Sequence, residues 1–120
     1  GVPLTIIVPN DVGTVYTSTL LQSGRIRIIA KGNLTMANGA GQPTSGLYMY
    51  LANGNIVTYQ PIENPVSAYI SSHQNVEFWK NFRGEILATG NVYVKATGIL
   101  TYDNSVLADD DFTLPGGMTE

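Results

Sequence analysis

The sequence contains no cysteine, and only 12% of its 120 residues are Asp, Glu, Lys or Arg. The lack of cysteine excludes disulfide bonds, and it also excludes a thiolate as nucleophile or metal ligand. The charged share is about half that of an average soluble domain, so neutral polar residues must keep the surface soluble. The net charge is −3 and the six basic residues do not cluster, so we expect no nucleic-acid partner.

Long apolar runs are also absent. The longest, residues 4–8, contains Thr5 and is followed by Pro9, whereas a membrane-spanning helix needs about 18 apolar residues or more. We therefore expect no membrane span. Apolar residues make up 43% of the chain, which is enough for one buried core at this length, and we predict one domain over residues 1–120.

Side chains typical of catalytic sites are scarce. The single histidine, His73, lies in a polar stretch, and no serine lies in a Gly-x-Ser-x-Gly motif. Glycoside hydrolysis needs two carboxylates at a fixed distance, and the spacing of Glu77 and Glu85 across an uncertain turn fixes none. We expect the protein not to be an enzyme and to need no cofactor.

The chain is rich in a pattern typical of β-strands. Apolar residues alternate with Thr, Asn, Gly and Tyr at a spacing of two, and Gly, Pro and Asn recur roughly every 8 to 12 residues. This spacing favours short antiparallel strands. We predict an all-β fold, a single antiparallel β-sandwich or jelly roll of about eight or nine strands. Residues 76–83 fit either a strand or a short helix, and the strand is favoured.

One turn has a specific signature. Two apolar runs, residues 47–51 and 56–59, flank the pair Asn53-Gly54. Asn-Gly readily adopts the positive φ angles that a tight two-residue turn needs. We therefore predict a β-hairpin around this pair.

One internal similarity occurs in the chain. Residues 27–39 align without a gap on residues 93–105, and five of the thirteen positions are identical. Two strands at equivalent places in two facing sheets would share a small-residue bend followed by a polar turn. Convergence on a common strand-turn pattern explains the match equally well, so the sequence leaves both readings open.

Aromatic side chains are the best candidates for ligand binding. Flat rings stack on the C–H faces of sugars, and Asn, Asp and Thr satisfy the hydroxyl groups. For any single Tyr, cross-strand packing is the alternative. The predicted hairpin would place some of its tyrosines on one surface, with the only tryptophan following in the chain. The candidate ligand-binding residues are Tyr48, Tyr50, Tyr59 and Trp79.

The densest group of oxygen-bearing side chains lies near the C-terminus. Calcium takes several oxygen ligands from carboxylates and amides, and the candidate metal ligands are Asp103, Asn104, Asp109 and Asp111. Their spacing matches no calcium-loop template, and adjacent residues of a strand point to opposite faces. A solvated acidic turn is the alternative.

These observations predict a non-catalytic, lectin-like recognition or adhesion module that binds a glycan or another cell-surface ligand. We expect it at an extracellular, cell-surface or virion-surface location. The alternative is a structural subunit of a virion, tail fibre or surface filament that assembles through strand edges. The apolar strand at residues 4–8 favours this alternative, and with it a homo-oligomer, because such a strand can be donated to a neighbour.

Overall fold

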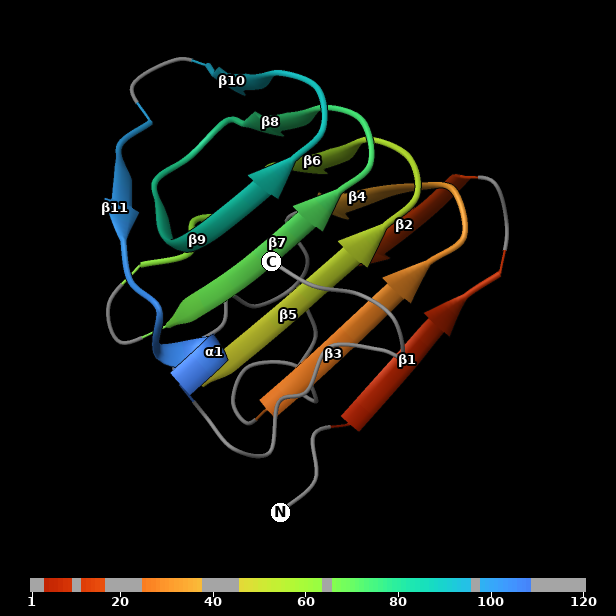
Figure 1. Ribbon diagram of the computed structural model, residues 1–120, viewed down its shortest axis with the longest axis horizontal. Coiled ribbons are helices and arrows are strands. Elements are labelled where there is room, and N and C mark those ends of the chain that lie inside the picture. The colour runs from red at the N-terminus through yellow and green to blue at the C-terminus, as the bar shows by residue number, and fades with distance from the viewer. Residues whose placement is uncertain are drawn as a thin grey trace.

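The protein is a β-solenoid in which successive turns of the chain stack on one another (Figure 1). The computed structural model describes residues 4–9, 12–16, 25–37, 46–63, 66–95 and 98–108. Each turn adds one strand to each of two sheets, here called sheet A and sheet B. Every strand ladder between the described strands is parallel.

Sheet A has six strands and sheet B has five. In spatial order, sheet A consists of β1 (Leu4–Val8), β3 (Arg25–Ala30), β5 (Leu47–Ala52), β7 (Ser67–Ser72), β9 (Phe82–Ala88) and β11 (Leu100–Tyr102). Sheet B consists of β10 (Val92–Val94), β8 (Val76–Phe78), β6 (Ile56–Thr58), β4 (Asn33–Ala37) and β2 (Val12–Tyr16). Consecutive strands thus alternate between the sheets.

The main core lies between the two sheets. Alternate residues of each strand point inward, so partners in the parallel register stack as apolar columns along the solenoid axis. Ile56, Val76 and Phe78 of sheet B are fully buried. Their counterparts from sheet A include Ile28 and Ile70.

The predicted antiparallel β-sandwich or jelly roll is wrong, although the described residues do form short strands, eleven in number. A strand with one face in a core alternates with a period of two whatever the direction of its neighbours. The Gly, Pro and Asn signals mark corners where the chain passes from one sheet to the other. They do not mark hairpins between paired strands.

The hairpin predicted at Asn53-Gly54 is likewise wrong. β5 pairs with β3 and β7 in sheet A, and β6 pairs with β4 and β8 in sheet B. The Gly54 N–H donates to the Gly32 carbonyl of the preceding turn at 2.9 Å. Glycine is needed here because corners stack closely: a Cβ on Gly54 would lie 2.2 Å from Asn33 Oδ1.

Residues 76–83 form β8, a short connection and the start of β9, so the strand reading is confirmed over the helix. The match between residues 27–39 and 93–105 does not mark equivalent structure. It aligns β3, an inner strand of sheet A, with β10, which is the outermost described strand of sheet B, so the two strands do not hold equivalent places.

The true repeat is a ladder of asparagines at the corner that leads into sheet B. Asn33 Oδ1 accepts from the Asn55 N–H at 2.8 Å, Asn55 Oδ1 from the Asn75 N–H at 3.0 Å, and Asn75 Oδ1 from the Asn91 N–H at 2.8 Å. Each side chain therefore supplies the acceptor that the next corner's backbone requires. The repeated motif reads Gly32-Asn33-Leu34, Gly54-Asn55-Ile56, Gln74-Asn75-Val76 and Gly90-Asn91-Val92.

Removing one rung of this ladder should cost stability. Asn55→Ala deletes the acceptor of the partly buried Asn75 N–H, and an unsatisfied buried donor costs about 1–3 kcal/mol. Asn53→Ala is the matched control, because Asn53 is exposed two residues away. Urea unfolding of both variants measures the difference. Equal losses would show that the ladder does not stabilise the corner.

The outer face of sheet A carries a second, smaller core under the helix α1 (Ser105–Ala108), which lies in front of this sheet in Figure 1. Val106 of the helix packs with Met49, Leu51 and Tyr69 of β5 and β7. Both faces of β5 are therefore apolar. Within the described residues, no helix is long and apolar enough to cross a membrane.

Candidate functional site

The outer face of sheet B gathers aromatic and charged side chains towards its β10 edge. We call this surface the aromatic face, and it comprises Tyr59, Glu77, Trp79, Tyr93 and Lys95. In β8, the buried Val76 and Phe78 point inward, so Glu77 between them points outward. The parallel register places Tyr93 of β10 beside Glu77.

Backbone hydrogen bonds extend this register one residue beyond the strands. The Trp79 N–H donates to the Thr58 carbonyl at 3.0 Å, and the Lys95 N–H donates to the Phe78 carbonyl at 2.7 Å. The Tyr59 N–H likewise donates to the Met36 carbonyl. Residues 59, 79 and 95 thus hold equivalent positions on three successive turns.

Tyr59 and Trp79 form an exposed aromatic pair. Their ring centroids are 5.7 Å apart and their planes are inclined by 33°. Tyr59 is 40% exposed and Trp79 is 38% exposed. Large apolar rings held at a surface are available for contact with a ligand.

Glu77 orients its neighbours. The Trp79 indole N–H donates to Glu77 Oε2 at 2.7 Å, and Lys95 Nζ lies 3.7 Å from Glu77 Oε1. The same ammonium lies 5.6 Å from the centre of the Tyr93 ring. An exposed ion pair adds little stability. The ion pair instead fixes the positions of the side chains, and side chains already held in place lose less entropy when a ligand binds.

The chemistry of the aromatic face suits a neutral, polyhydroxylated ligand. The rings offer apolar contact, Glu77 offers carboxylate lone pairs, and Lys95 offers N–H donors. Hydrogen-bonding groups set around a flat apolar surface can fix the orientation of such a ligand. Among the described residues, no group of three or more His, Asp or Glu could hold a metal ion.

The four predicted ligand-binding residues fall into two places. Tyr59 and Trp79 come together on the aromatic face. Tyr48 and Tyr50 are 2% and 1% exposed, on the inner face of sheet A. Their rings are buried in the core and cannot contact a ligand at the surface. Burial raises the pKa of Tyr48 to about 12, and it raises the pKa of Tyr50 further.

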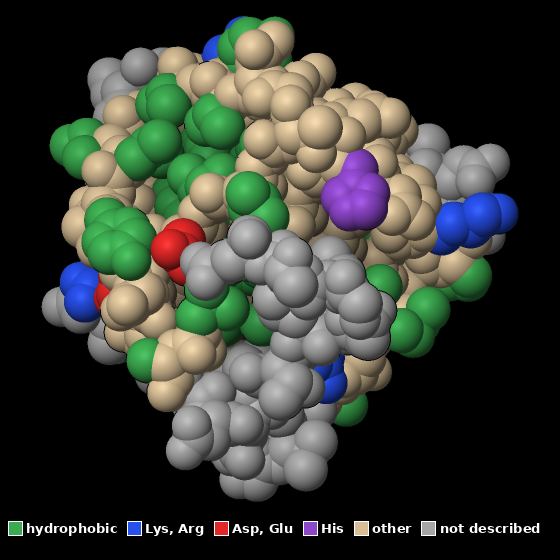
Figure 2. Space-filling view, in the orientation of Figure 1, with side chains coloured by type: hydrophobic (Ala, Val, Ile, Leu, Met, Phe, Trp, Pro, Cys, Tyr) green, Lys and Arg blue, Asp and Glu red, His purple; other side chains and the backbone are tan. Residues whose placement is uncertain are grey.

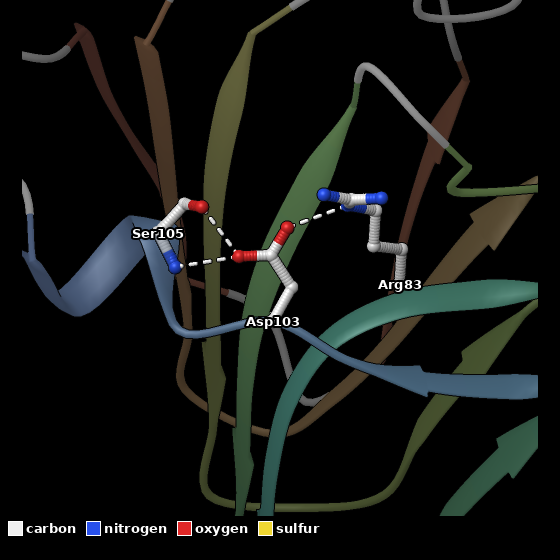
Figure 3. Close-up of polar contacts among 3 residues, drawn as sticks. All are labelled: Arg83, Asp103 and Ser105. Atoms are coloured by element: carbon white, nitrogen blue, oxygen red, sulfur yellow. Dashed lines mark hydrogen bonds and ion pairs between the residues drawn. The ribbon is translucent and has the colours of Figure 1, made fainter.

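Among the predicted metal ligands, Asp103 has a structural role (Figure 3). One carboxylate oxygen accepts from Arg83 Nε at 2.5 Å, and the other accepts from the Ser105 backbone N–H at 2.8 Å and from its hydroxyl. The Ser105 hydroxyl, with Arg83, holds the Asp103 pKa below its ordinary value. Asn104 is exposed, and Asp109 and Asp111 lie outside the described residues.

A second candidate is a cavity of about 450 Å³ beside β9 and β11, lined by Ile62, Glu63, Asn81, Arg83 and Ile99 among others. Its polar side chains already hydrogen-bond to other residues of the protein. Asn81 Nδ2 donates to Glu63 Oε1, Asn81 Oδ1 accepts from the Ile99 N–H, and Arg83 binds Asp103. The aromatic face, with exposed and oriented rings, is the stronger candidate.

Sequence reasoning missed Tyr93 and Lys95, and it considered Glu77 only as a catalytic carboxylate. Aligning the chain on the ladder asparagines would have found them. Residues 55–59, 75–79 and 91–95 read NIVTY, NVEFW and NVYVK. The third position of each segment, occupied by Val57, Glu77 and Tyr93, lies on the outer face of sheet B. The fifth position lies on the same face and is occupied by Tyr59, Trp79 and Lys95.

No family model matches the chain, and neither does any curated protein or solved structure. The aromatic face is therefore the basis for assigning a function.

Proposed function

We propose that this protein is a non-catalytic recognition module that binds a carbohydrate on the aromatic face. The observation that carries the proposal is the exposed Tyr59–Trp79 pair, in which Glu77 holds the indole of Trp79. A sugar would place its C–H face on these rings, and its hydroxyl groups would meet Glu77 and Lys95. The weakly charged composition suits work at a cell or virion surface, where we place the protein.

The test begins with a broad glycan array, probed with and without calcium. Trp79 is the only tryptophan in the chain, so its fluorescence reports directly on the proposed site. Any glycan that binds on the array should change the tryptophan emission in a saturable titration. A glycan that binds without changing this emission would place the ligand elsewhere.

Removing either ring should weaken binding. We expect Trp79→Ala and Tyr59→Ala each to raise the Kd about tenfold or more, since covering a large apolar side chain is worth about 1.5–3 kcal/mol and about 1.4 kcal/mol changes a Kd tenfold. Tyr102→Ala is the matched control, because Tyr102 is a 71% exposed ring on β11 of the other sheet. Calorimetric titration of the variants, each shown to be folded, measures the Kd. Equal affinity in all three would refute the site.

A second candidate function is a structural subunit of a virion, tail fibre or surface filament. One observation favours it: apolar side chains at inward-facing positions of the last turn are exposed. Such a subunit would use the solenoid as a rigid rod.

A further inference from the structure

In the last described turn of the solenoid, apolar side chains are exposed at positions that face inward in the other turns. Val92 and Val94 of β10 pair in register with Val76 and Phe78, whose side chains are fully buried. Partners in register share a face of the sheet, yet Val92 is 41% exposed and Val94 is 44% exposed. Leu100 of β11, which pairs with the buried Phe82, is 40% exposed. Figure 2 shows apolar side chains gathered on this side of the molecule.

The backbone is also open at this end. β10 and β11 are the outermost strands of their sheets among the described strands. An outermost strand presents N–H and C=O groups on its free side, and these groups can pair with another strand. Soluble solenoids cover their ends with polar capping turns. An apolar interior beside two free strand edges is instead suited to continue the stack.

The opposite end has matching properties. β1 and β2 are the outermost of the described strands there. Leu4 pairs in register with the buried Ile26 and is 55% exposed, and Ile6 and Val8 of the same face are half-buried. All ladders between the described strands are parallel. A second copy shifted along the axis therefore brings its β1 beside β11, and its β2 beside β10, without a change of strand direction.

We propose that two copies dock head to tail, with β10 of one copy pairing in parallel with β2 of the next and the end of β11 meeting the start of β1. Continuing the strand registers places Val94 next to Val15 of the second copy and Tyr102 next to its Leu4. Val94 and Leu100 then lie under the first turn of the second copy. The two surfaces differ, so the contact is heterologous and can repeat into a linear array. This docking specifies how copies would assemble if the protein is a structural subunit. It does not depend on glycan binding.

The test measures mass in solution by light scattering after gel filtration, over a range of concentrations. The wild-type chain should form dimers and larger species as concentration rises. Leu100→Lys and Leu4→Lys each put a charge at one end, and each should raise the concentration for half-association at least about tenfold. Val57→Lys on the outer face of sheet B, in mid-solenoid, should associate like wild type. Val94→Lys replaces Leu100→Lys if circular dichroism shows that the latter is unfolded.

Mixing the two blocked variants identifies the geometry. Leu100→Lys keeps a competent β1 end and Leu4→Lys keeps a competent β11 end, so an equimolar mixture should form dimers that neither variant forms alone. A wild-type chain that stays monomeric would overturn the proposal. Dimers of Leu4→Lys alone would show pairing of two β11 ends and overturn the head-to-tail arrangement. Association that neither lysine weakens would place assembly on another surface, which leaves the structural-subunit candidate standing without this docking.

Discussion

Gly84→Ala is expected to destabilise the solenoid by about 3 kcal/mol or more, enough to remove much of the stability of a domain of this size. Gly84 has a φ of 152°, a conformation that L side chains rarely adopt. In the β7–β9 ladder it pairs with Ala68. A Cβ on Gly84 would lie 1.7 Å from the Ala68 carbonyl oxygen. Backbone strain and steric overlap therefore act together.

Gly98→Ala is the control for this substitution. Its added Cβ would lie 3.2 Å from the Lys80 carbonyl oxygen and from Val94 Cγ1, so small shifts can accommodate it. Chemical unfolding followed by circular dichroism should show a large fall in midpoint for Gly84→Ala and a small one for Gly98→Ala. The same midpoint for both would mean that β9 does not approach β7 as closely as described.

The strands could be predicted from the sequence, but their pairing could not. Alternation of apolar and polar residues shows that one face of a strand is buried, and it does not show the direction of the neighbouring strand. The asparagine ladder would have revealed a solenoid. Its members Asn33, Asn55, Asn75 and Asn91 are separated by 22, 20 and 16 residues. These unequal intervals hide the repeat from a search at one fixed period.

The candidate site was predicted in part, for a physical reason that β5 illustrates. Tyr48 and Tyr50 alternate with Leu47, Met49 and Leu51, and both faces of this strand are covered, one by the main core and one by α1. With apolar residues on both faces, alternation cannot show which face holds the tyrosines. Residues 76–78 read Val-Glu-Phe, so Trp79 falls on the polar face with Glu77 and its exposure could be foreseen. Residues 56–58 read Ile-Val-Thr, which does not show the face that Tyr59 takes.

The buried tyrosines predict that the protein unfolds in alkali. An unfolded tyrosine ionises near pH 10, whereas burial raises the pKa of Tyr48 to about 12. Burial raises the pKa of Tyr50 beyond that, and the neighbouring Tyr48 charge adds to the rise. The folded state thus retains protons that the unfolded chain loses. This stabilisation is complete below about pH 10 and is lost as the pH rises through the folded pKa values.

Urea unfolding at a series of pH values, with tyrosinate absorbance recorded in parallel, measures this effect. We expect the free energy of unfolding to fall steeply between about pH 10 and 12, and ionisation of the two buried rings to coincide with loss of the β-sheet signal. Tyr48→Phe should make the fall shallower, because one of the two coupled rings can no longer ionise. Tyr102→Phe alters an exposed ring and should leave the profile unchanged. A free energy of unfolding that stays constant across this range would contradict the burial of Tyr48 and Tyr50 between the two sheets.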